Sequence, residues 1–330
     1  MRARPNVLVS SYYARAATDP VLARLQPVAT VRRVDLAPDA REAFLAALQG
    51  CAVAVVSGER FDARTFAAAP ELRLVCCDGT GVDHIDLRAA TDHGVTITNA
   101  PVVHEACADL AMALILAVVR RILTADEGVR AGRWNDRSRY VAPRDVYGST
   151  LGLLGFGRVG EALARRAQGF GMNLIAHSPH ADPARLQAAG VRHVDFDELL
   201  AQADILSIHV RLTEEKRGLI GAREISLMKN GAYLVNTSRG AVIDEAALAV
   251  ALREGKIAGA GLDVLAQEPP AGDHPLFQLK NVVLSPHVGS DTDTSFARVF
   301  HCVVDDILLY LGGQAPKNIM NPAILQRGLR

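Results

Sequence analysis

A glycine-rich turn in the middle of the chain constrains the fold more than any other stretch. The apolar residues 150–154 predict a buried strand, and the next six residues, 155–160, read GFGRVG. A helix over 161–170 and a strand over 173–177 would complete a βαβ unit. Gly155 permits the tight turn, Gly157 close approach of a ligand to the backbone, and Gly160 close packing of the helix on the sheet. This pattern predicts a dinucleotide pyrophosphate at the helix N-terminus; the alternative is a glycine-rich turn in another doubly wound sheet.

Short apolar strands alternate with helices on both sides of this unit. Strands are expected at 7–10, 51–56, 72–77, 94–99, 205–209, 232–236, 259–263 and 282–285, and helices at 41–48, 104–125, 245–254 and 294–311. The alternation predicts an α/β fold with two doubly wound parallel-sheet domains, a Rossmann dinucleotide-binding domain and a smaller flavodoxin-like domain. Because no strand follows the last helix, we expect it to return to the first unit. The domains would then comprise residues 1–100 with 291–330, and residues 101–290.

Composition narrows the function classes. The 36 basic and 36 acidic residues balance, which argues against a nucleic-acid binder. The longest apolar stretch, 110–119, is too short to cross a bilayer, and the N-terminus leads directly into a strand. No signal peptide is therefore expected, and a cytoplasmic location is predicted. The five cysteines show no CxxC spacing, so we expect packed thiols rather than disulfides, and no metal site.

Polar residues follow several predicted strands at the edge where parallel sheets bind ligands. Arg239, Glu268 and His287 each follow one of these strands, and a turn containing Thr80 and Gly81 follows another. Such a set suits reduction of a 2-oxo acid, because Arg239 can bind the carboxylate and carbonyl oxygen while His287 donates a proton. Glu268 would hydrogen-bond the far ring nitrogen, and the Thr80 and Gly81 amides would bind the carboxylate. Taken singly, these residues also fit a surface arginine, a turn histidine and a loop-capping glutamate.

At these residues the chain resembles the D-isomer-specific 2-hydroxyacid dehydrogenases. The shared motifs include DGTGVD at 78–83, the glycine turn, NTSRG at 236–240, GLDV at 261–264 and SPH at 285–287. The resemblance implies a catalytic set of Arg239, Glu268 and His287, with Asp263 near the nicotinamide carboxamide. It also implies a split substrate domain, a small 2-oxo or 2-hydroxy acid as the substrate, and a homodimer formed largely through the dinucleotide-binding domain.

The resemblance also implies an NAD(P) site, and its residues favour NADP. The predicted cofactor-binding residues are Gly155, Phe156, Gly157, Arg158, Val159, His177, Ser178, Arg211, Thr213, Thr237 and Asp263. Ser178 stands where NAD-preferring relatives carry an acidic residue, so a 2′-phosphate would not be repelled. His177, His180 and Arg211 can bind that phosphate. In the alternative, these three are solvated and Asp182 reaches the ribose.

Two other functions remain compatible with the sequence. Corepressors that resemble this family retain the fold and the catalytic set, so a dinucleotide-sensing regulator without enzymatic activity is one alternative. A phosphite-type dehydrogenase is the other. The balanced charge does not favour the first, and the cleft residues needed for the second have no clear counterparts here.

Overall fold

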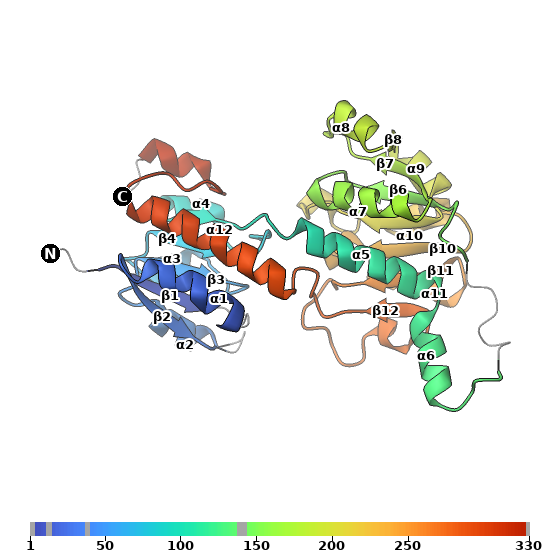
Figure 1. The fold of residues 1–330 in the computed structure, drawn as a ribbon, viewed down its shortest axis with the longest axis horizontal. Helices are drawn as coiled ribbons and strands as arrows, with labels where there is room; N and C mark the ends of the chain where they lie inside the picture. The colour runs from blue at the N-terminus through green and yellow to red at the C-terminus, as the bar shows by residue number, and fades with distance from the viewer. Residues whose placement is uncertain (1–3, 11–14, 37–39, 137–143, 328–330) are drawn as a thin grey trace. The chain divides into compact units, whose positions relative to one another are not determined.

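The chain divides into two compact units, each with its own parallel sheet (Figure 1). The computed structural model describes residues 4–10, 15–36, 40–136 and 144–327. Unit 1 comprises Met1–Val103 and Ser290–Arg330, and unit 2 comprises His104–Gly289. The predicted fold class, α/β with two parallel sheets, is confirmed.

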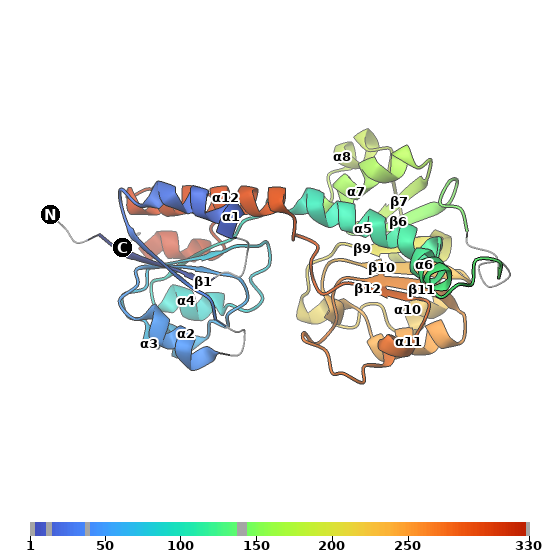
Figure 2. The same cartoon turned by 60° about the horizontal axis from the view of Figure 1, so that its bottom comes forward.

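Unit 1 contains a five-stranded sheet in the order β2-β1-β3-β4-β5. Its strands are β1 Asn6–Ser10, β2 Thr30–Val34, β3 Val53–Val56, β4 Leu74–Cys77 and β5 Thr96–Thr98. On one face lie α2 Arg41–Leu48, α3 Ala63–Ala68 and α4 Leu87–Asp92; on the other lie α1 Arg15–Leu22 and α12 Asp293–Leu311 (Figure 2). Phe44, Phe61 and Phe66 pack in the core under the first group of helices. This strand order is the flavodoxin-like one.

Unit 2 contains a seven-stranded sheet in the order β12-β11-β10-β9-β6-β7-β8. Its strands are β6 Thr150–Leu154, β7 Asn173–His177, β8 Arg192–His193, β9 Ile205–Ile208, β10 Ala232–Asn236, β11 Ile257–Leu262 and β12 Val282–Leu284. The strand order reverses between β6 and β9, which is the Rossmann arrangement. The glycine turn follows β6, so it lies at the point where the sheet changes direction.

Two apolar cores cover the two faces of this sheet. The first includes residues of α5 His104–Val119, α7 Arg158–Gly169 and α8 Pro183–Ala188. The second includes residues of α9 Phe196–Gln202, α10 Ala222–Leu227 and α11 Glu245–Arg253. Because both faces are covered, the strands are apolar nearly throughout, which is why the sequence shows apolar runs here rather than alternation.

The predicted helix over 104–125 is wrong in one respect, because it is two helices. α5 ends at Val119, and α6 begins at Ile122 and runs to Arg130. Arg121 adopts a left-handed conformation with φ of 51° between them. The apolar residues of α5 pack closely on β11, where a Cβ on Gly259 would lie 2.6 Å from Val118 Cγ2. The apolar stretch of α5 ends where Arg120 and Arg121 follow. Beyond Val119, α5 would therefore have no apolar side chains to pack on the core.

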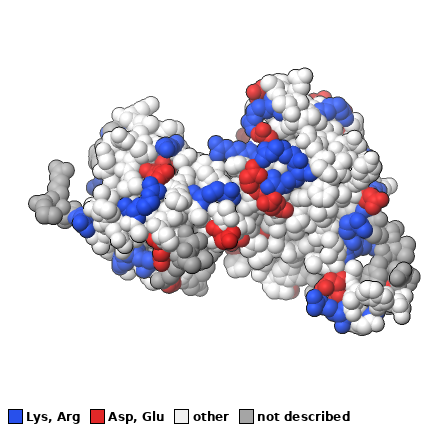
Figure 3. All heavy atoms as spheres, viewed as in Figure 1, with Lys and Arg blue, Asp and Glu red and all other residues white. Residues whose placement is uncertain are grey.

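The structure contains elements that the sequence did not predict. β2 and α1 were not expected, and α7 begins at Arg158 rather than at 161. Among the described residues, no helix is long and apolar enough to span a membrane. Acidic and basic side chains are interspersed on the face shown in Figure 3, in keeping with the balanced composition.

Candidate active site

The glycine turn after β6 is shaped by close backbone contacts. Gly155 has φ of 97°, and a Cβ there would lie 2.7 Å from the carbonyl oxygen of His209. A Cβ on Gly160 would lie 2.6 Å from the carbonyl oxygen of Gly155. In contrast, a Cβ on Gly157 would meet no atom within 4 Å. The first and third glycines therefore allow the turn and the helix to pack, whereas the second borders open space.

The residues around this turn fit a dinucleotide pyrophosphate. Gly157 precedes α7 and supplies no side-chain cap, so the N–H groups of the first turn remain for an anion. Arg158 is exposed beside them, whereas the Phe156 side chain is buried and leaves only its backbone for binding. Thr237 Oγ1 is buried and has no hydrogen-bond partner among the described residues, so it could accept or donate a hydrogen bond to a bound ligand.

The end of β7 carries no acidic residue. His177 Nδ1 lies 3.0 Å from the Val194 carbonyl oxygen, and its ring packs near Phe196. Ser178 is half-buried, and Arg211 and Thr213, after β9, are exposed. The carboxylate of Asp182 accepts a hydrogen bond from the Ala184 N–H at 2.9 Å, so this residue caps α8.

His209 supports the glycine turn from the neighbouring strand. Its Nε2 lies 2.9 Å from Ser207 Oγ, and its ring borders Gly160. Burial lowers the pKa of His209 to about 4, so the imidazole is neutral at pH 7. His209 was not among the predicted site residues, because its contacts with Ser207 and Gly160 form only in the folded chain.

Glu268 and His287 form a direct pair in unit 2. His287 Nδ1 lies 2.6 Å from Glu268 Oε2, and the second oxygen, Glu268 Oε1, accepts the Leu265 N–H at 3.0 Å. The two side chains are 37% and 46% exposed, respectively. Since Nδ1 is engaged, Nε2 is the ring nitrogen that remains to exchange a proton with a bound molecule.

Asp263 shapes the turn that carries His287. Its buried carboxylate accepts hydrogen bonds from Ser285 Oγ at 2.6 Å and from the Val288 and Gly289 N–H groups at 2.9 Å. Its carbonyl oxygen accepts the His287 N–H at 2.7 Å. The resemblance implied a position near the nicotinamide for Asp263. The observed contacts show that Asp263 also holds the turn of residues 285–289 in shape.

Arg239 is placed by the buried residue that ends β10. Asn236 Nδ2 donates to the Arg239 carbonyl oxygen at 2.9 Å, and Asn236 Oδ1 accepts from the Ser238 N–H at 2.9 Å. Arg239 Nη1 donates to the Ser238 carbonyl oxygen at 2.7 Å. Gly240 follows, and a Cβ there would lie only 1.9 Å from the Leu265 carbonyl carbon. The arginine turn is therefore packed directly on the segment that leads to Glu268.

The charges in this group shift two pKa values in opposite directions. The hydrogen bond that His287 donates to Glu268 raises the pKa of His287; burial and the charge of Arg239 oppose this shift but do not cancel it. Burial alone would raise the pKa of Glu268, but the hydrogen bond and charge of His287, with Arg239, lower it overall. The pair thus favours an imidazolium beside a carboxylate, which is a proton donor suited to neutral pH.

Comparison with known proteins identifies the family. Residues 112–289 match the family model "D-isomer specific 2-hydroxyacid dehydrogenase, NAD binding domain". A glyoxylate reductase of Korarchaeum cryptofilum is 41% identical over 296 residues, which cover 88% of this chain and 89% of that protein. The chain belongs to the D-isomer specific 2-hydroxyacid dehydrogenase family.

Other members of the family extend the likeness. The D-3-phosphoglycerate dehydrogenase of Mycobacterium leprae is 39% identical over 96% of this chain and 59% of its own length. The crystal structure of a glyoxylate reductase from Paecilomyes thermophila has a TM-score of 0.87 at 32% identity, covering 98% of this chain and all of that one. The predicted family and the predicted activity, an NAD(P)-dependent oxidoreductase of the 2-hydroxyacid dehydrogenase type, are therefore confirmed.

The predicted substrate-binding turn of this dehydrogenase lies in unit 1. Thr80 is exposed, and its carbonyl oxygen accepts a hydrogen bond from Asn99 Nδ2 at 2.7 Å. The buried Asp78 accepts a hydrogen bond from Ser57 Oγ at 2.7 Å. These contacts hold the turn in shape and leave the Thr80 and Gly81 amides as predicted carboxylate ligands.

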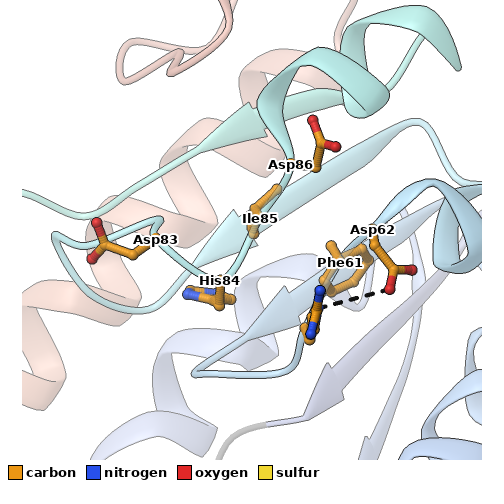
Figure 4. Close-up of a pocket in the computed structure, with 7 residues that line it drawn as sticks. Phe61, Asp62, Asp83, His84, Ile85 and Asp86 are labelled. Carbon is orange, nitrogen blue, oxygen red and sulfur yellow. Dashed lines mark ion pairs between the residues drawn. The ribbon is translucent and has the colours of Figure 1, made fainter. Parts of the chain in front are cut away.

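Unit 1 also has a surface pocket of about 440 Å³ (Figure 4). Two of its acidic residues have local tasks: Asp62 caps α3 and Asp86 caps α4 through their carboxylates. Arg60 Nε lies 3.8 Å from Asp62, the ion pair marked in Figure 4. No group of three or more His, Cys, Asp or Glu residues suited to a metal occurs in the described part of the chain. We therefore assign this pocket no catalytic role.

Proposed function

We propose that this protein reduces small 2-oxo acids to 2-hydroxy acids with NAD(P)H, using His287 as the proton donor. The observation that carries the proposal is the 2.6 Å hydrogen bond between His287 Nδ1 and Glu268 Oε2. It holds the imidazole in one orientation and favours its protonated form. The glycine turn that suits a dinucleotide belongs to the same unit.

The chemistry assigns one task to each residue. The reduced dinucleotide, when bound, supplies a hydride to the carbonyl carbon of the substrate. His287 Nε2 gives its proton to the carbonyl oxygen, and Glu268 stabilises the imidazolium before that transfer. Arg239 binds the carboxylate and polarises the carbonyl oxygen. The amides of Thr80 and Gly81 stay predicted ligands of a carboxylate. In the oxidative direction, His287 accepts the proton instead.

The names of relatives guide the choice of substrate. Glyoxylate is the substrate in the name of the Korarchaeum cryptofilum relative, which matches this chain over most of its length. We therefore propose glyoxylate and similarly small 2-oxo acids as substrates of this chain.

We further propose that NADPH is preferred over NADH. Ser178 at the end of β7 lacks the charge that would repel a 2′-phosphate, and the exposed Arg211 can pair with one. His177 and His180 lie on the same segment, and Thr213 follows Arg211. Asp182, the residue that would favour NADH, is engaged at the start of α8.

Titration by NAD(P)H fluorescence should give a lower Kd for NADPH, and Ser178→Asp should weaken NADPH binding more than NADH binding. A lower Kd for NADH in the unaltered protein would contradict this preference.

A single assay tests the proposed activity. Oxidation of NADPH and NADH is followed spectrophotometrically with glyoxylate, hydroxypyruvate, pyruvate, phenylpyruvate and 2-oxoglutarate. Turnover of the smaller acids supports the proposal. Tight dinucleotide binding without turnover of any of the five would contradict it. The cytoplasmic location and the homodimer stay predictions.

A further inference from the structure

We propose that Glu245 and His274 are positioning residues for the reaction, because they hold residues 265–268 where Glu268 meets His287. The inference rests on the proposed functions of Glu268 and His287. Neither Glu245 nor His274 contacts that pair directly, so their effect would pass through the loop that follows β11.

Glu245 binds this loop through both carboxylate oxygens. Oε1 accepts the Ala266 N–H at 2.7 Å, and Oε2 lies 3.1 Å from His274 Nε2. The Leu276 N–H donates to His274 Nδ1 at 3.4 Å, so the hydrogen on Nε2 points to the carboxylate. The side chains of Glu245 and His274 are 16% and 15% exposed. One carboxylate thus ties together two points of the loop, on either side of Glu268.

Glu245 is not needed to cap its own helix. The neighbouring Asp244 accepts hydrogen bonds from the Ala246 and Ala247 N–H groups at 3.0 Å each, which is the usual N-terminal cap. An acidic residue in the first helical turn is ordinarily a solvated charge. Here both carboxylate oxygens of Glu245 instead bind the loop, which is why we assign Glu245 a role in positioning that loop.

The loop is also supported from the turn that carries Arg239. A Cβ on Gly240 would lie 1.9 Å from the Leu265 carbonyl carbon and 2.3 Å from the Ala266 nitrogen. Two successive amides, those of Leu265 and Ala266, are then held by two different carboxylates, Glu268 and Glu245. Residues 265 and 266 are therefore held from two sides, by the hydrogen bond to Glu245 of α11 and by the close approach of Gly240.

This support keeps the Glu268 carboxylate between the Leu265 amide and the histidine. With Oε1 bound to the Leu265 N–H, Oε2 is left for His287 Nδ1 at 2.6 Å. The other charged groups that act on His287 are Arg239 and Asp263. When the Ala266 anchor is lost, Glu268 shifts, its bond to His287 weakens, and His287 gives up its proton at a lower pH.

The test is Glu245→Ala in the full-length protein, with two readouts. For 2-oxo acid reduction we expect kcat to fall about 10- to 100-fold with an unchanged KM for the dinucleotide. The fall of kcat at alkaline pH, the alkaline limb of the kcat–pH profile, should begin at a lower pH. In the protein without ligands, an NMR titration of His287, assigned with His287→Asn, should show its midpoint moving the same way. Glu245→Gln keeps an acceptor for the Ala266 N–H but turns an amide NH2 toward the His274 Nε2–H, so it should lose less turnover than Glu245→Ala without reaching the wild-type level.

Asp244→Ala is the matched control. It removes two hydrogen bonds at the same helix end, so it should lower Tm. The alkaline limb of the kcat–pH profile and the midpoint of the His287 NMR titration should stay unchanged. His274→Ala takes over the test if Glu245→Ala does not fold. A wild-type pH profile of kcat and a wild-type His287 midpoint in Glu245→Ala, or in His274→Ala when it replaces Glu245→Ala, would overturn the inference. If the unaltered protein reduces no 2-oxo acid, the proposed function fails, but the NMR midpoints still decide whether Glu245 positions Glu268.

Discussion

At the scale of single residues, His287 combines an unfavourable backbone with several local supports. Its φ of 55° is left-handed, which costs a non-glycine residue roughly 1–2 kcal/mol. The His287 N–H donates to the Asp263 carbonyl oxygen at 2.7 Å, and Nδ1 lies 2.6 Å from Glu268. Strained backbone kept by such contacts is common where a side chain must hold one orientation for function.

Glu268→Gln should move the pH dependence of 2-oxo acid reduction. The raised pKa of His287 depends first on the hydrogen bond to Glu268. Reduction consumes the His287 proton, so its rate falls as pH rises through that pKa. With the carboxylate charge gone, the alkaline limb of kcat should shift to lower pH, toward the ordinary histidine value of about 6.5. The measurement is the kcat–pH profile of the variant. An alkaline limb at the same pH as in the unaltered protein would contradict this prediction. Glu254→Gln, at the exposed end of α11, is the control and should leave the profile unchanged.

The sequence predicts some of these residues and not others for a physical reason. Arg239, Glu268 and His287 can be predicted because each follows an apolar strand, and parallel strands end at one edge. Glu245 instead acts by binding the Ala266 N–H and the His274 ring, which lie 21 and 29 residues away in the sequence and come close only in the folded chain. In the sequence, Glu245 looks like an ordinary acid in a first helical turn. Its second contact cannot be inferred from that pattern.

At the scale of secondary structure elements, close packing sets the positions of glycine. Gly155 and Gly160 bring β6, α7 and the end of β9 together, and Gly259 and Gly261 admit α5 to the face of β11. The apolar runs and the GFGRVG turn made these strands predictable. The break between α5 and α6 and the edge strand β2 were missed, since β2 contains Arg32 and Arg33 and has no fully buried residue.

Gly240→Ala should destabilise the protein. The added methyl group would meet the backbone of Leu265 and Ala266, which cannot move aside as a flexible side chain does. We expect a loss of about 1–3 kcal/mol in the free energy of unfolding, measured by urea denaturation. Gly272→Ala, later in the same loop and with no atom within 4 Å of the new Cβ, should change it by less than about 0.5 kcal/mol. Equal effects of the two substitutions would refute this packing account.

At the scale of the whole molecule, the proposed homodimer has a candidate contact surface in unit 2. Ile122, Leu123 and Val129 of α6 and the following Trp134 are 49%, 55%, 46% and 66% exposed. In Figure 1, α6 extends beyond the lower edge of unit 2. Several exposed apolar side chains on one short stretch of chain are a feature of surfaces that bind another protein.

Leu123→Glu combined with Trp134→Glu should convert a dimer to a monomer. Two charges placed in a buried apolar contact would lack partners, which costs several kcal/mol of association free energy. Sedimentation equilibrium gives the mass directly. Leu325→Glu, at a 46% exposed site in unit 1, is the control and should leave the mass unchanged. A double variant that keeps the mass of the unaltered dimer would show that the contact lies elsewhere.

The most direct test of the account is the turnover of His287→Ala. Removal of the imidazole should lower kcat for 2-oxo acid reduction by about 10²- to 10⁴-fold, the range typical of a lost general acid. Dinucleotide binding, measured by fluorescence titration, should be preserved, because the glycine turn is separate from the His287 turn. Turnover close to that of the unaltered protein would contradict the assignment of His287 as the proton donor.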